Sequence, residues 1–310
     1  ETDVKEILMK SSNILVIGSL NMDWIIKVPR TPLAGETLTG EFSLAVPGGK
    51  GANQAFAASN LGGHVYMLGA VGTDEDGQTL IQTLKKAHVH TDAIAQLENN
   101  KTGLALIYVN SEGDNTIVVL PNANAKVDHA AIDAHMDLMH HSDIVLLQME
   151  IPEETLYYAI DLAHSLGKTI ILNPAPAPDA IPDHILSKID YLTPNETELA
   201  TLSGIQADTF ENVEKACQYL IAKGVKNVIT TLGPRGALLV NQERTAHFEG
   251  FPAHAIDTTA AGDSFNGAIA TYLSQGKTID EAITFGNKVA SITVTRVGAQ
   301  SSIPSLEEVL

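Results

Sequence analysis

The sequence predicts an α/β domain in which a mainly parallel sheet is covered by helices on both faces. Short apolar runs, rich in branched residues, alternate with longer amphipathic stretches from Asn13 onward. Strands buried on both faces form such continuous apolar runs, and parallel strands need helical crossovers between them. The 310 residues, 44% of them hydrophobic, are enough to bury one sizeable core. We therefore expect one domain over residues 13–310, preceded by an N-terminal extension without fixed structure at residues 1–12.

The individual elements follow from the length and period of each apolar run. Strands are expected where the run is short, at residues 14–17, 65–68, 144–147, 169–172, 191–192 and 228–231. Helices are expected where apolar residues recur at helical spacing, at residues 52–61, 77–87, 152–166, 210–221 and 268–273. Gly276 follows the last of these and is expected to end that helix. Polar residues follow several of the strands, as they do at the ligand sites of open α/β sheets.

Two pairs of strand-like segments interrupt this alternation. Residues 24–28 and 37–46 come before any long helix, and residues 104–109 and 116–120 form a second pair. Hairpins clustered in this way suggest a small sheet over the mouth of the main one. We therefore expect a β-sheet lid formed by about residues 24–46 and 104–120.

The composition restricts the partners and the compartment. The formal net charge is −18 at pH 7, whereas nucleic acid and anionic membranes favour basic surfaces, so we expect neither as a partner. No apolar run approaches the ~20 residues that span a bilayer, and the first ten residues lack the pattern of a signal peptide. The single cysteine, Cys217, excludes an internal disulfide, which is typical of a reducing compartment. The expected location is cytoplasmic.

The segment DTTAAGDSFNG at residues 257–267 combines small residues with a carboxylate at the expected start of a helix. The small residues Ala260, Ala261 and Gly262 let backbone N–H groups approach another molecule, and the helix that begins here makes them an anion site. Asp263 stands in the same turn. A carboxylate there would repel a phosphate unless it takes a proton from the other reactant, as phosphoryl transfer to a hydroxyl requires. The alternative is that Asp263 only caps the helix.

Two segments near the N-terminus suit a neutral polyhydroxy ligand. Asn21 and Asp23 follow the first strand, so an extended backbone would direct both side chains to one face, although an Asx turn is the alternative. The segment PGGKGANQA at residues 47–55 leads into a helix with Asn53 in its first turn. It is neither a P-loop nor the Gly-x-Gly-x-x-Gly dinucleotide fingerprint. These positions lack the cluster of Arg and Lys that a phosphorylated sugar would require.

Three further polar segments follow predicted strands. Glu150 comes after the strand at 144–147 and suits a sugar hydroxyl, although many strand ends have a solvated Glu. Asn195 and Glu198 are three residues apart at a helix start, a spacing that a capping box also produces. The segment TLGPRG at residues 231–236 is a strand-to-turn segment, in which Arg235 either meets a phosphate or points into solvent.

These motifs resemble those of the ribokinase-type carbohydrate kinase family. The string at residues 257–267 looks like the C-terminal signature of that family, and GGKGAN at residues 48–53 looks like its N-terminal sugar-binding signature. The resemblance extends from Asn13 to Pro304. It implies a ribokinase-like three-layer α/β sandwich with a mainly parallel central sheet. It also implies that the lid closes the sugar site and joins two subunits in a homodimer.

The resemblance implies ATP-dependent phosphorylation of D-ribose at O5, giving D-ribose 5-phosphate and ADP. Asp263 would be the general base, and the amides of Ala260, Ala261, Gly262 and Asp263 would stabilise the transferring group. The implied sugar ligands are Asn21, Asp23, Gly49, Lys50, Asn53, Glu150 and Asp263. ATP with its Mg²⁺ is assigned to Asn195, Glu198, Thr231, Gly233, Arg235, Gly236, Gly262 and Asn287. An activating K⁺ is assigned to Asp257, Thr259, Thr293, Arg296, Gly298 and Ser302.

Two other functions remain open at this stage. One is the same fold acting on another sugar or on a nucleoside, and the other is a non-catalytic protein that senses a sugar or a nucleotide. Asp263 and its anion site argue against the sensor, because sensing needs no base. An oxidoreductase that binds a dinucleotide is disfavoured because the glycine fingerprint is absent.

Overall fold

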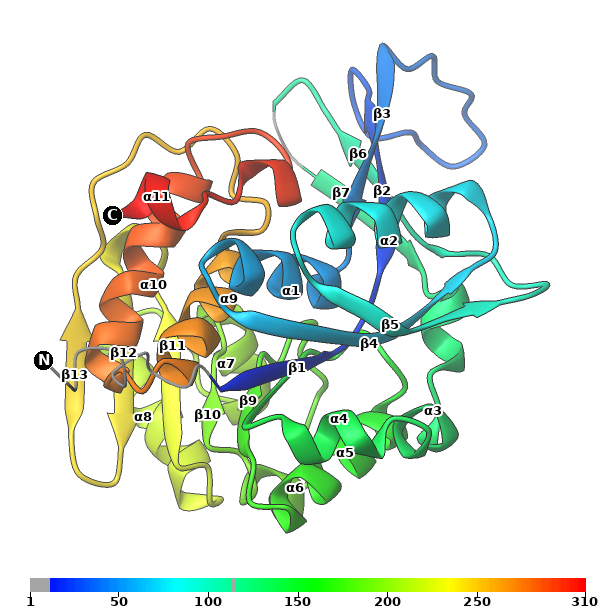
Figure 1. Cartoon of the computed structure of the whole chain (residues 1–310). Coiled ribbons are helices and arrows are strands. Elements are labelled where there is room, and N and C mark those ends of the chain that lie inside the picture. Colours follow the sequence, from blue (N-terminus) through cyan, green and yellow to red (C-terminus); the bar gives the residue numbers. More distant parts are fainter. Residues whose placement is uncertain (1–11, 113–114) are drawn as a thin grey trace, which may run out of the picture.

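A nine-stranded sheet runs through the middle of the protein in the computed structural model, which describes residues 12–112 and 115–310 (Figure 1). Its strands are β1 (Asn13–Ile17), β4 (His64–Gly72), β5 (His90–Leu97), β8 (Ile144–Leu147), β9 (Thr169–Leu172), β10 (Tyr191–Leu192), β11 (Asn227–Thr231), β12 (Ala237–Asn241) and β13 (Thr245–Phe248). They are ordered β13-β12-β11-β10-β9-β8-β1-β4-β5, parallel from β11 to β5, with β12 and β13 pairing antiparallel at one edge. The predicted mainly parallel sheet is confirmed. The predicted extension lies outside the described residues except for Ser12.

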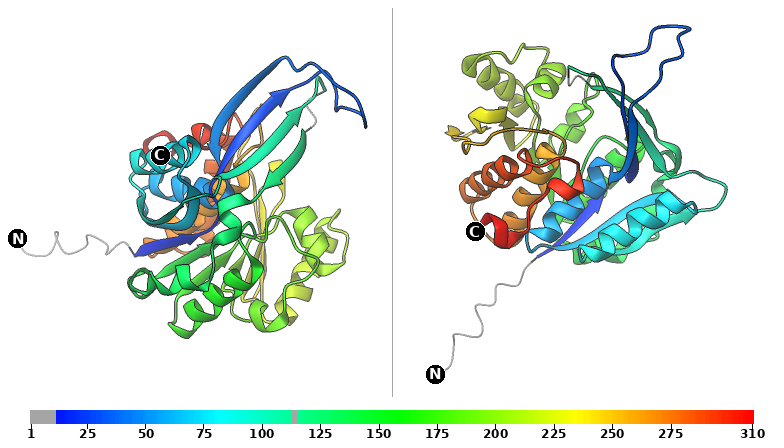
Figure 2. Two further views of the ribbon diagram at one scale, coloured as in Figure 1. Left: turned by 90° about the vertical axis from the view of Figure 1, so that its right-hand side faces the viewer. Right: turned by 90° about the horizontal axis from the view of Figure 1, so that it is seen from above.

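Helices cover both faces of this sheet because its strands direct side chains into two separate cores (Figures 1 and 2). Ile14 and Val16 of β1 belong to one core, whereas Leu15 and Ile17 belong to the other. The first core is covered by α1 (Lys50–Asn60), α2 (Glu75–Lys86), α9 (Ala261–Ser274) and α10 (Ile279–Thr293). The second is covered by α3 (His129–Asp133), α4 (Met136–His141), α5 (Glu153–Ser165), α6 (Asp183–Leu186), α7 (Glu196–Ser203) and α8 (Phe210–Ala222). The short elements α11 (Leu306–Val309), η1 (Asn122–Lys126), η2 (Gly233–Arg235) and η3 (Gln300–Ser302) complete the three-layer sandwich.

The strands that the sequence did not reveal lie toward the two edges of the sheet. β5 forms one edge, and the hairpin of β12 and β13 forms the other. The edge strands β5 and β13 alternate exposed with more buried residues, so they lack the continuous apolar run that marks the central strands. The helices expected at residues 52–61, 77–87, 152–166 and 210–221 correspond to α1, α2, α5 and α8. Gly276 has a φ of 74° and follows the last residue of α9 closely, as expected.

A second sheet of four strands, the lid, projects from the main body (Figure 2). Its order is β3 (Phe42–Gly48), β2 (Asn21–Lys27), β6 (Gly103–Val109) and β7 (Asn115–Leu120). The predicted small sheet is confirmed, but it begins at Asn21, closer to β1 than expected. Asn21 and Asp23 are therefore lid residues, and any movement of the lid moves them.

Helices α1 and α9 approach each other closely and both contribute to the site described below. A Cβ on Gly267 of α9 would lie 2.6 Å from the Cβ of Ala57 on α1, so a side chain at this position would force the helices apart. The hydroxyl of Thr271 donates to the carbonyl oxygen of Ala58 at 3.0 Å. This close packing holds the two helices in one relative position.

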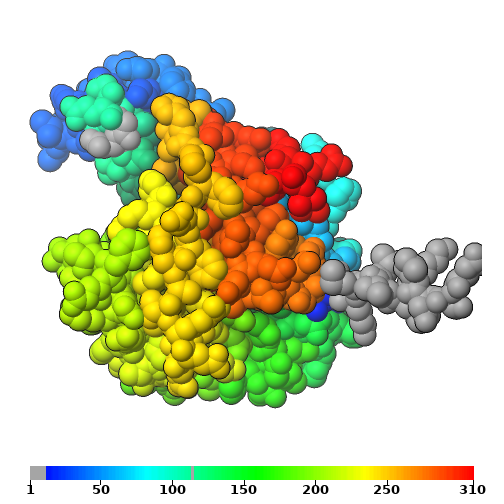
Figure 3. All heavy atoms as spheres, turned by 90° about the vertical axis from the view of Figure 1, so that its left-hand side faces the viewer, coloured from blue at the N-terminus to red at the C-terminus, as the bar shows by residue number. Residues whose placement is uncertain are grey.

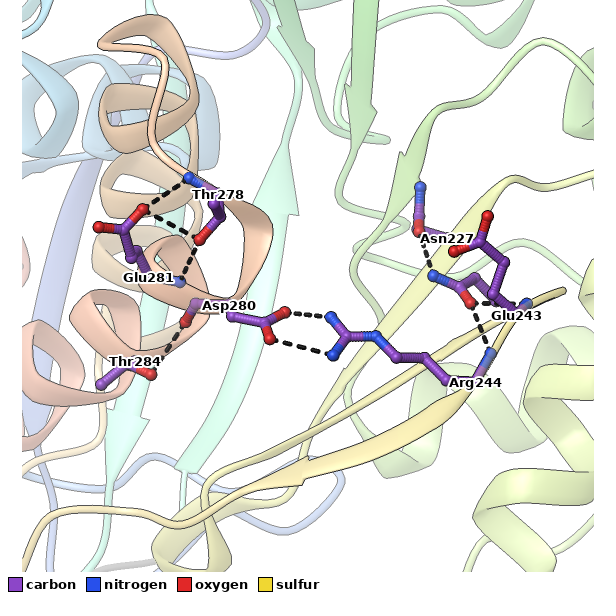
Figure 4. Close-up of polar contacts among 8 residues, drawn as sticks. Asn227, Glu243, Arg244, Thr278, Asp280, Glu281 and Thr284 are labelled. Atoms are coloured by element: carbon purple, nitrogen blue, oxygen red, sulfur yellow. Dashed lines mark hydrogen bonds and ion pairs between the residues drawn. The ribbon is translucent and has the colours of Figure 1, made fainter.

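Helix α10 packs against α9, and its start is tied to the β12–β13 turn (Figure 4). The guanidinium of Arg244 forms a bidentate pair with the carboxylate of Asp280. Thr278 and Glu281 cap the helix reciprocally in a capping box. In the described part of the chain, no helix has both the length and the hydropathy needed to cross a membrane.

Candidate active site

Two cavities open where the parallel strands end. The inner cavity, of about 430 Å³, lies under the lid, and the outer cavity, of about 500 Å³, lies between the turn after β11 and helix α10. Thr231, Thr258 and Gly262 line both, so the two cavities meet at the amino end of α9. On the face shown in Figure 3, the surface is hollowed between the lid and the main body. This arrangement allows one ligand in each cavity, with their reacting ends at α9.

The lid strand β2 directs Asn21 and Asp23 into the inner cavity, as its extended backbone predicts. Asn124 fixes the first of them, because its Nδ2 donates to Oδ1 of Asn21 at 2.7 Å. The Oδ1 of Asn124 in turn accepts from the backbone N–H of Leu20 at 3.0 Å. Since the oxygen of Asn21 is taken by Asn124, its Nδ2 group is the part that can donate to a ligand.

Asp23 is buried among other carboxylates. Burial, followed by the negative charges of Glu150 and Asp263, raises the pKa of Asp23 to about 7, and Lys50 only partly offsets these effects. Gly48 packs against this carboxyl group, since a Cβ on Gly48 would lie 2.0 Å from Oδ2 of Asp23. The carboxyl of Asp23 therefore exchanges its proton near neutral pH and presents either an acceptor or a donor to a ligand.

Lys50 is the cation of the inner cavity. Burial lowers the pKa of its ammonium group, but the surrounding carboxylates outweigh burial and raise it. Those carboxylates are Asp263, Glu150, Glu198 and Asp23. The backbone N–H of Lys50 donates to Oε2 of Glu150 at 3.1 Å, and the same oxygen accepts from the hydroxyl of Ser19. With a single ammonium against several carboxylates, the cavity is negative, so a polyphosphate would enter favourably only together with cations.

Asp263 is buried in the first turn of α9, and α1 holds both of its oxygens. Asn53 donates from Nδ2 to Oδ2 of Asp263 at 2.9 Å, and Gln54 donates from Nε2 to Oδ1 at 3.0 Å. The N-cap residue of α9 is Ala260, whose side chain makes no capping bond. The carboxylate of Asp263 thus contacts a neighbouring helix and the cavity, which fits a chemical role better than a cap.

The amino end of α9 is the predicted anion site. Ala260 has a φ of 60°, in the left-handed region that L-residues rarely adopt. The N–H of Ala261 already donates to the carbonyl oxygen of Thr258 at 3.2 Å. A Cβ on Gly262 would meet no other atom within 4 Å, because this residue faces open space. The amides of Gly262 and Asp263 lie in the turn where helix N–H groups have no intrahelical partner, so they are available to an anion at this end of α9.

Apart from Asn195 and Glu198, which line the inner cavity, the residues assigned to ATP lie around the outer cavity with one exception. Thr231, Gly233, Gly236 and Asn287 line it. Asn287 also holds β13 in place, since its Nδ2 donates to the carbonyl oxygens of Phe248 at 3.1 Å and of Glu249 at 3.2 Å. The exception is Arg235, whose guanidinium pairs with Glu196 and lies 5.1 Å from the ring centre of Phe210. Of the two alternatives for Arg235, the structure favours the surface position.

Asn195 and Glu198 begin α7 and form the capping box that the spacing allowed. Oδ1 of Asn195 accepts from the N–H of Glu198 at 2.8 Å, and Oε2 of Glu198 accepts from the N–H of Asn195 at 2.9 Å. Both residues also line the inner cavity. Burial raises the pKa of Glu198, although its bond to the backbone of Asn195 opposes the effect. The cap leaves a second carboxylate oxygen, so the same residues also suit a hydrated Mg²⁺.

The residues assigned to a monovalent cation lie on the loop before α9 and in the segment from the end of α10 to η3, and Asp257 joins the two. Its Oδ1 accepts from the N–H of Thr259 and its Oδ2 from the N–H of Gly298, each at 2.9 Å. The other assigned residues are Thr293 and Ser302, which are buried, and Arg296, whose side chain pairs with Glu308. The two hydrogen bonds of Asp257 bring two backbone segments together, and their carbonyl oxygens could bind a cation. The guanidinium of Arg296 does not contribute to this arrangement.

The sequence did not reveal the polar residues that hold the site residues in place through hydrogen bonds. These are Ser19, Gln54, Asn124, Asn173 and Gln300. Ser19 and Asn173 closely follow β1 and β9, so the rule that ligands gather at strand ends could have found them. Gln54 follows Asn53 in the segment at residues 47–55, which the sequence already predicts to suit a ligand. Nothing local marks Asn124 or Gln300, because their partners are distant in the sequence.

Comparison with known proteins agrees with this geometry. Residues 11–306 match the pfkB family of carbohydrate kinases. The ribokinase of Staphylococcus aureus is 39% identical over 301 residues, covering 96% of this chain and 99% of that protein. The deoxyribokinase of Salmonella typhimurium is 36% identical over 296 residues, covering 96% and 97%. The structure of Arabidopsis thaliana ribokinase complexed with ribose and ATP has a TM-score of 0.91 at 34% identity, covering 96% and 97%. The chain therefore belongs to the pfkB family of carbohydrate kinases.

Proposed function

We propose that this chain transfers the γ-phosphoryl group of ATP to the 5-hydroxyl of D-ribose, giving D-ribose 5-phosphate and ADP. The observation that best supports the proposal is the position of Asp263, which lines the inner cavity next to Gly262, where the two cavities meet. A base beside one ligand and a helix amino end beside the other are the parts that phosphoryl transfer needs. Relatives named ribokinase support ribose as the sugar.

Ribose occupies the inner cavity in this proposal. Asn21 donates from Nδ2, Asp23 and Glu150 bind hydroxyl groups, and Asn53 keeps one N–H for the sugar while the other stays on Asp263. Gly49 and Lys50 complete the sugar site. Asp263 accepts the proton of the 5-hydroxyl as O5 bonds to the γ-phosphorus. The bond from that phosphorus to the β–γ bridging oxygen breaks, and ADP leaves with the electron pair.

ATP occupies the outer cavity, with its triphosphate directed to the amino end of α9. Thr231, Gly233, Gly236 and Asn287 surround the nucleoside part, and Arg235 contributes through its backbone. The amides of Gly262 and Asp263 stabilise the negative charge of the transferring group. Mg²⁺ neutralises the polyphosphate charge, and Asn195 and Glu198 would hold it through its water shell. Such neutralisation suits the excess of carboxylates around Lys50.

A monovalent cation, K⁺, is proposed between the two loops that Asp257 joins. Backbone oxygens of these loops and the hydroxyl of Ser302 would surround it. The first loop continues directly into Ala260 and Gly262, so a cation that orders it also orders the anion site.

We further propose a homodimer in which the lids of two chains pack together. Large apolar side chains are exposed on three of the four lid strands, β2, β3 and β7, which is unusual for a surface that only faces water. They are Trp24, Phe42, Leu44, Ile117, Val118, Val119 and Leu120. The edge strands β3 and β7 would also gain a neighbour.

The test of the proposed function is ribose-dependent release of ADP from ATP in the presence of Mg²⁺ and K⁺. Ribose-dependent release, with phosphate found on C5 of the product, is the expected result. Release that is absent with ribose, but present with another sugar or a nucleoside, would overturn the choice of substrate. A second candidate is 2-deoxyribose, which the relatives named deoxyribokinase favour. Comparing kcat/KM for the two pentoses decides between them.

A further inference from the structure

The two oxygens of Asp263 lie in different surroundings. Oδ2 accepts from Asn53, which lines the inner cavity, whereas Oδ1 accepts from Gln54, whose side chain is fully buried. A ligand in the cavity can share the contact at Oδ2, but the bond at Oδ1 is out of its reach. The geometry therefore assigns proton acceptance to Oδ2 and leaves Oδ1 as a fixed anchor.

The amide of Gln54 has one stable orientation because each of its polar atoms has a partner. Its Nε2 donates to Oδ1 of Asp263 and to Oδ1 of Asn173, both at 3.0 Å. Its Oε1 accepts from Nε2 of Gln148 at 2.8 Å. Turning the amide over would place Oε1 against two acceptor oxygens and Nε2 against a donor. The side chain of Gln54 thus always offers its donors to the carboxylate.

The partners of Gln54 are themselves fixed to the main sheet. Gln148 and Asn173 directly follow β8 and β9, and Nδ2 of Asn173 donates to the carbonyl oxygen of Thr193 at 3.0 Å. The contact between Gly267 and Ala57 fixes the spacing of α9 and α1, which hold the two ends of the Asp263–Gln54 bond. The carboxylate is therefore anchored to a rigid frame.

We propose that Gln54 is a positioning residue for the transfer reaction, because it anchors Oδ1 of the Asp263 carboxylate and turns Oδ2 toward the attacking hydroxyl. This inference rests on the proposed function. A hydrogen bond donated to a carboxylate favours its ionised form, and correct orientation of a base is a large part of its effect. If Gln54 served only to join α1 to the sheet, its loss would lower stability and leave the pH dependence of turnover unchanged.

The first test variant is Gln54→Met, which keeps the length of the side chain and removes both donors. We expect kcat to fall about 10- to 100-fold, the factor that loss of a hydrogen bond to a charged group commonly brings. The KM for ribose should change less than about threefold, because Gln54 does not touch the cavity. The acid limb of the pH profile of kcat/KM should move to higher pH, because a hydrogen-bond donor that favours the ionised form is lost at Oδ1.

The second variant, Gln54→Glu, keeps the shape and places two carboxyl groups in contact. Two carboxylates in contact repel each other, which favours binding of a proton between them, so the acid limb should move further than in Gln54→Met. The Gln54→Glu variant also tests the proposed role of Gln54 if Gln54→Met does not fold. The charged groups that face this region are Lys50 on α1, Asp23 on β2, Glu198 on α7 and Glu150 after β8. All of them are unchanged in both variants, and Gln54→Met adds no charge, so a limb that moves in Gln54→Met reports the loss of the Gln54 amide.

The matched control is Thr271→Val, which removes another hydrogen bond between α9 and α1 without touching Asp263. It should lower the melting temperature yet keep the wild-type pH profile. A wild-type enzyme without ribose-dependent ADP release overturns the proposed function, and this inference with it. An active wild-type enzyme whose Gln54 variants keep the wild-type acid limb overturns this inference alone.

Discussion

Gly48 and Asp23 touch across the first two strands of the lid: a Cβ on Gly48 would lie 2.0 Å from Oδ2 of Asp23. Gly48 pairs with Asn21 and Asp23 pairs with Val46 in the same antiparallel ladder, so the backbone cannot easily separate the two. The Asp23 side chain is buried, with 9% of its surface exposed, and has little room to turn away. The position of the carboxyl in the inner cavity thus depends on the absence of a side chain at Gly48.

Gly48→Ala should weaken sugar binding more than nucleotide binding. The methyl group displaces the Asp23 carboxyl, and losing one such contact raises the KM for ribose by about tenfold. The KM for ATP should hardly change, because the proposed ATP site is the outer cavity. Gly40→Ala, just before β3, is the control for a tight contact elsewhere, since its Cβ would approach the backbone carbonyl oxygen of Lys27 at 3.3 Å and not the Asp23 carboxyl. An unchanged KM for ribose in Gly48→Ala would show that Asp23 does not contact the sugar.

Asp23→Asn should stabilise the ligand-free protein, and more so at alkaline pH. The pKa of Asp23 is raised to about 7 in the folded protein by burial and by Glu150 and Asp263, against roughly 3.9 in an unfolded chain. The folded state therefore binds an extra proton between these values. Its stability falls by about 1.4 kcal/mol per pH unit as the pH rises from about 4 to 7, and then levels off.

The asparagine variant lacks this loss, since its side chain does not titrate. Thermal unfolding without sugar, measured from pH 5 to pH 8, should show that the advantage of Asp23→Asn grows with pH and stops growing above about pH 7. An advantage independent of pH would mean that Asp23 is ionised throughout. The same variant should bind ribose more weakly, because an acceptor is lost.

The variant Gly262→Ala tests whether turnover needs the open space beside Gly262, which the fold itself does not need. A Cβ there would meet no protein atom within 4 Å, and the residue lines both cavities. Alanine also favours a helix by about 1 kcal/mol over glycine, so the melting temperature should not fall. The methyl group nevertheless projects to the place where the phosphoryl group passes, and we expect kcat to fall by about 100-fold. Normal turnover would place the transfer elsewhere.

Asp263→Asn should nearly abolish turnover while the protein stays folded. General bases commonly account for 10²–10⁴-fold in rate, and asparagine has the same shape without the basicity. The new NH₂ group faces the donors of Asn53 or Gln54, so a small loss of stability is expected as well. ADP release and a thermal melt on one preparation test both expectations. Near-normal turnover would remove Asp263 from the role of base.

Much of the fold and of the site could be predicted from the sequence because local patterns of residues determine both. The central strands are continuous apolar runs, and the helix starts at residues 50 and 261 contain distinctive strings. The same locality explains the misses. β13 is an edge strand without an apolar run, and Arg235 pairs with Glu196 only because β11 and α7 are neighbours in the fold.

The electrostatics of the site could not be predicted in the same way. The high pKa of Asp23 comes first from its burial and then from Glu150 and Asp263, which lie on other elements far along the chain. Gln54 is next to Asn53 in the sequence, but its role depends on Gln148 meeting it from the end of β8. Local motifs therefore predict which residues take part, whereas tertiary packing determines how each is charged and oriented.

Asp257→Asn tests whether the two loops beside α9 respond to a monovalent cation. The carboxylate of Asp257 accepts from Thr259 with one oxygen and from Gly298 with the other. The amide variant keeps only one acceptor, so the loops separate and the proposed K⁺ loses its charged partner. We expect wild-type turnover to be higher in K⁺ than in tetramethylammonium at equal ionic strength. In Asp257→Asn, turnover in K⁺ should drop roughly tenfold, to the level in tetramethylammonium. Equal wild-type turnover in the two salts would contradict the cation site, whereas a K⁺ response retained in the variant would exclude Asp257 from it.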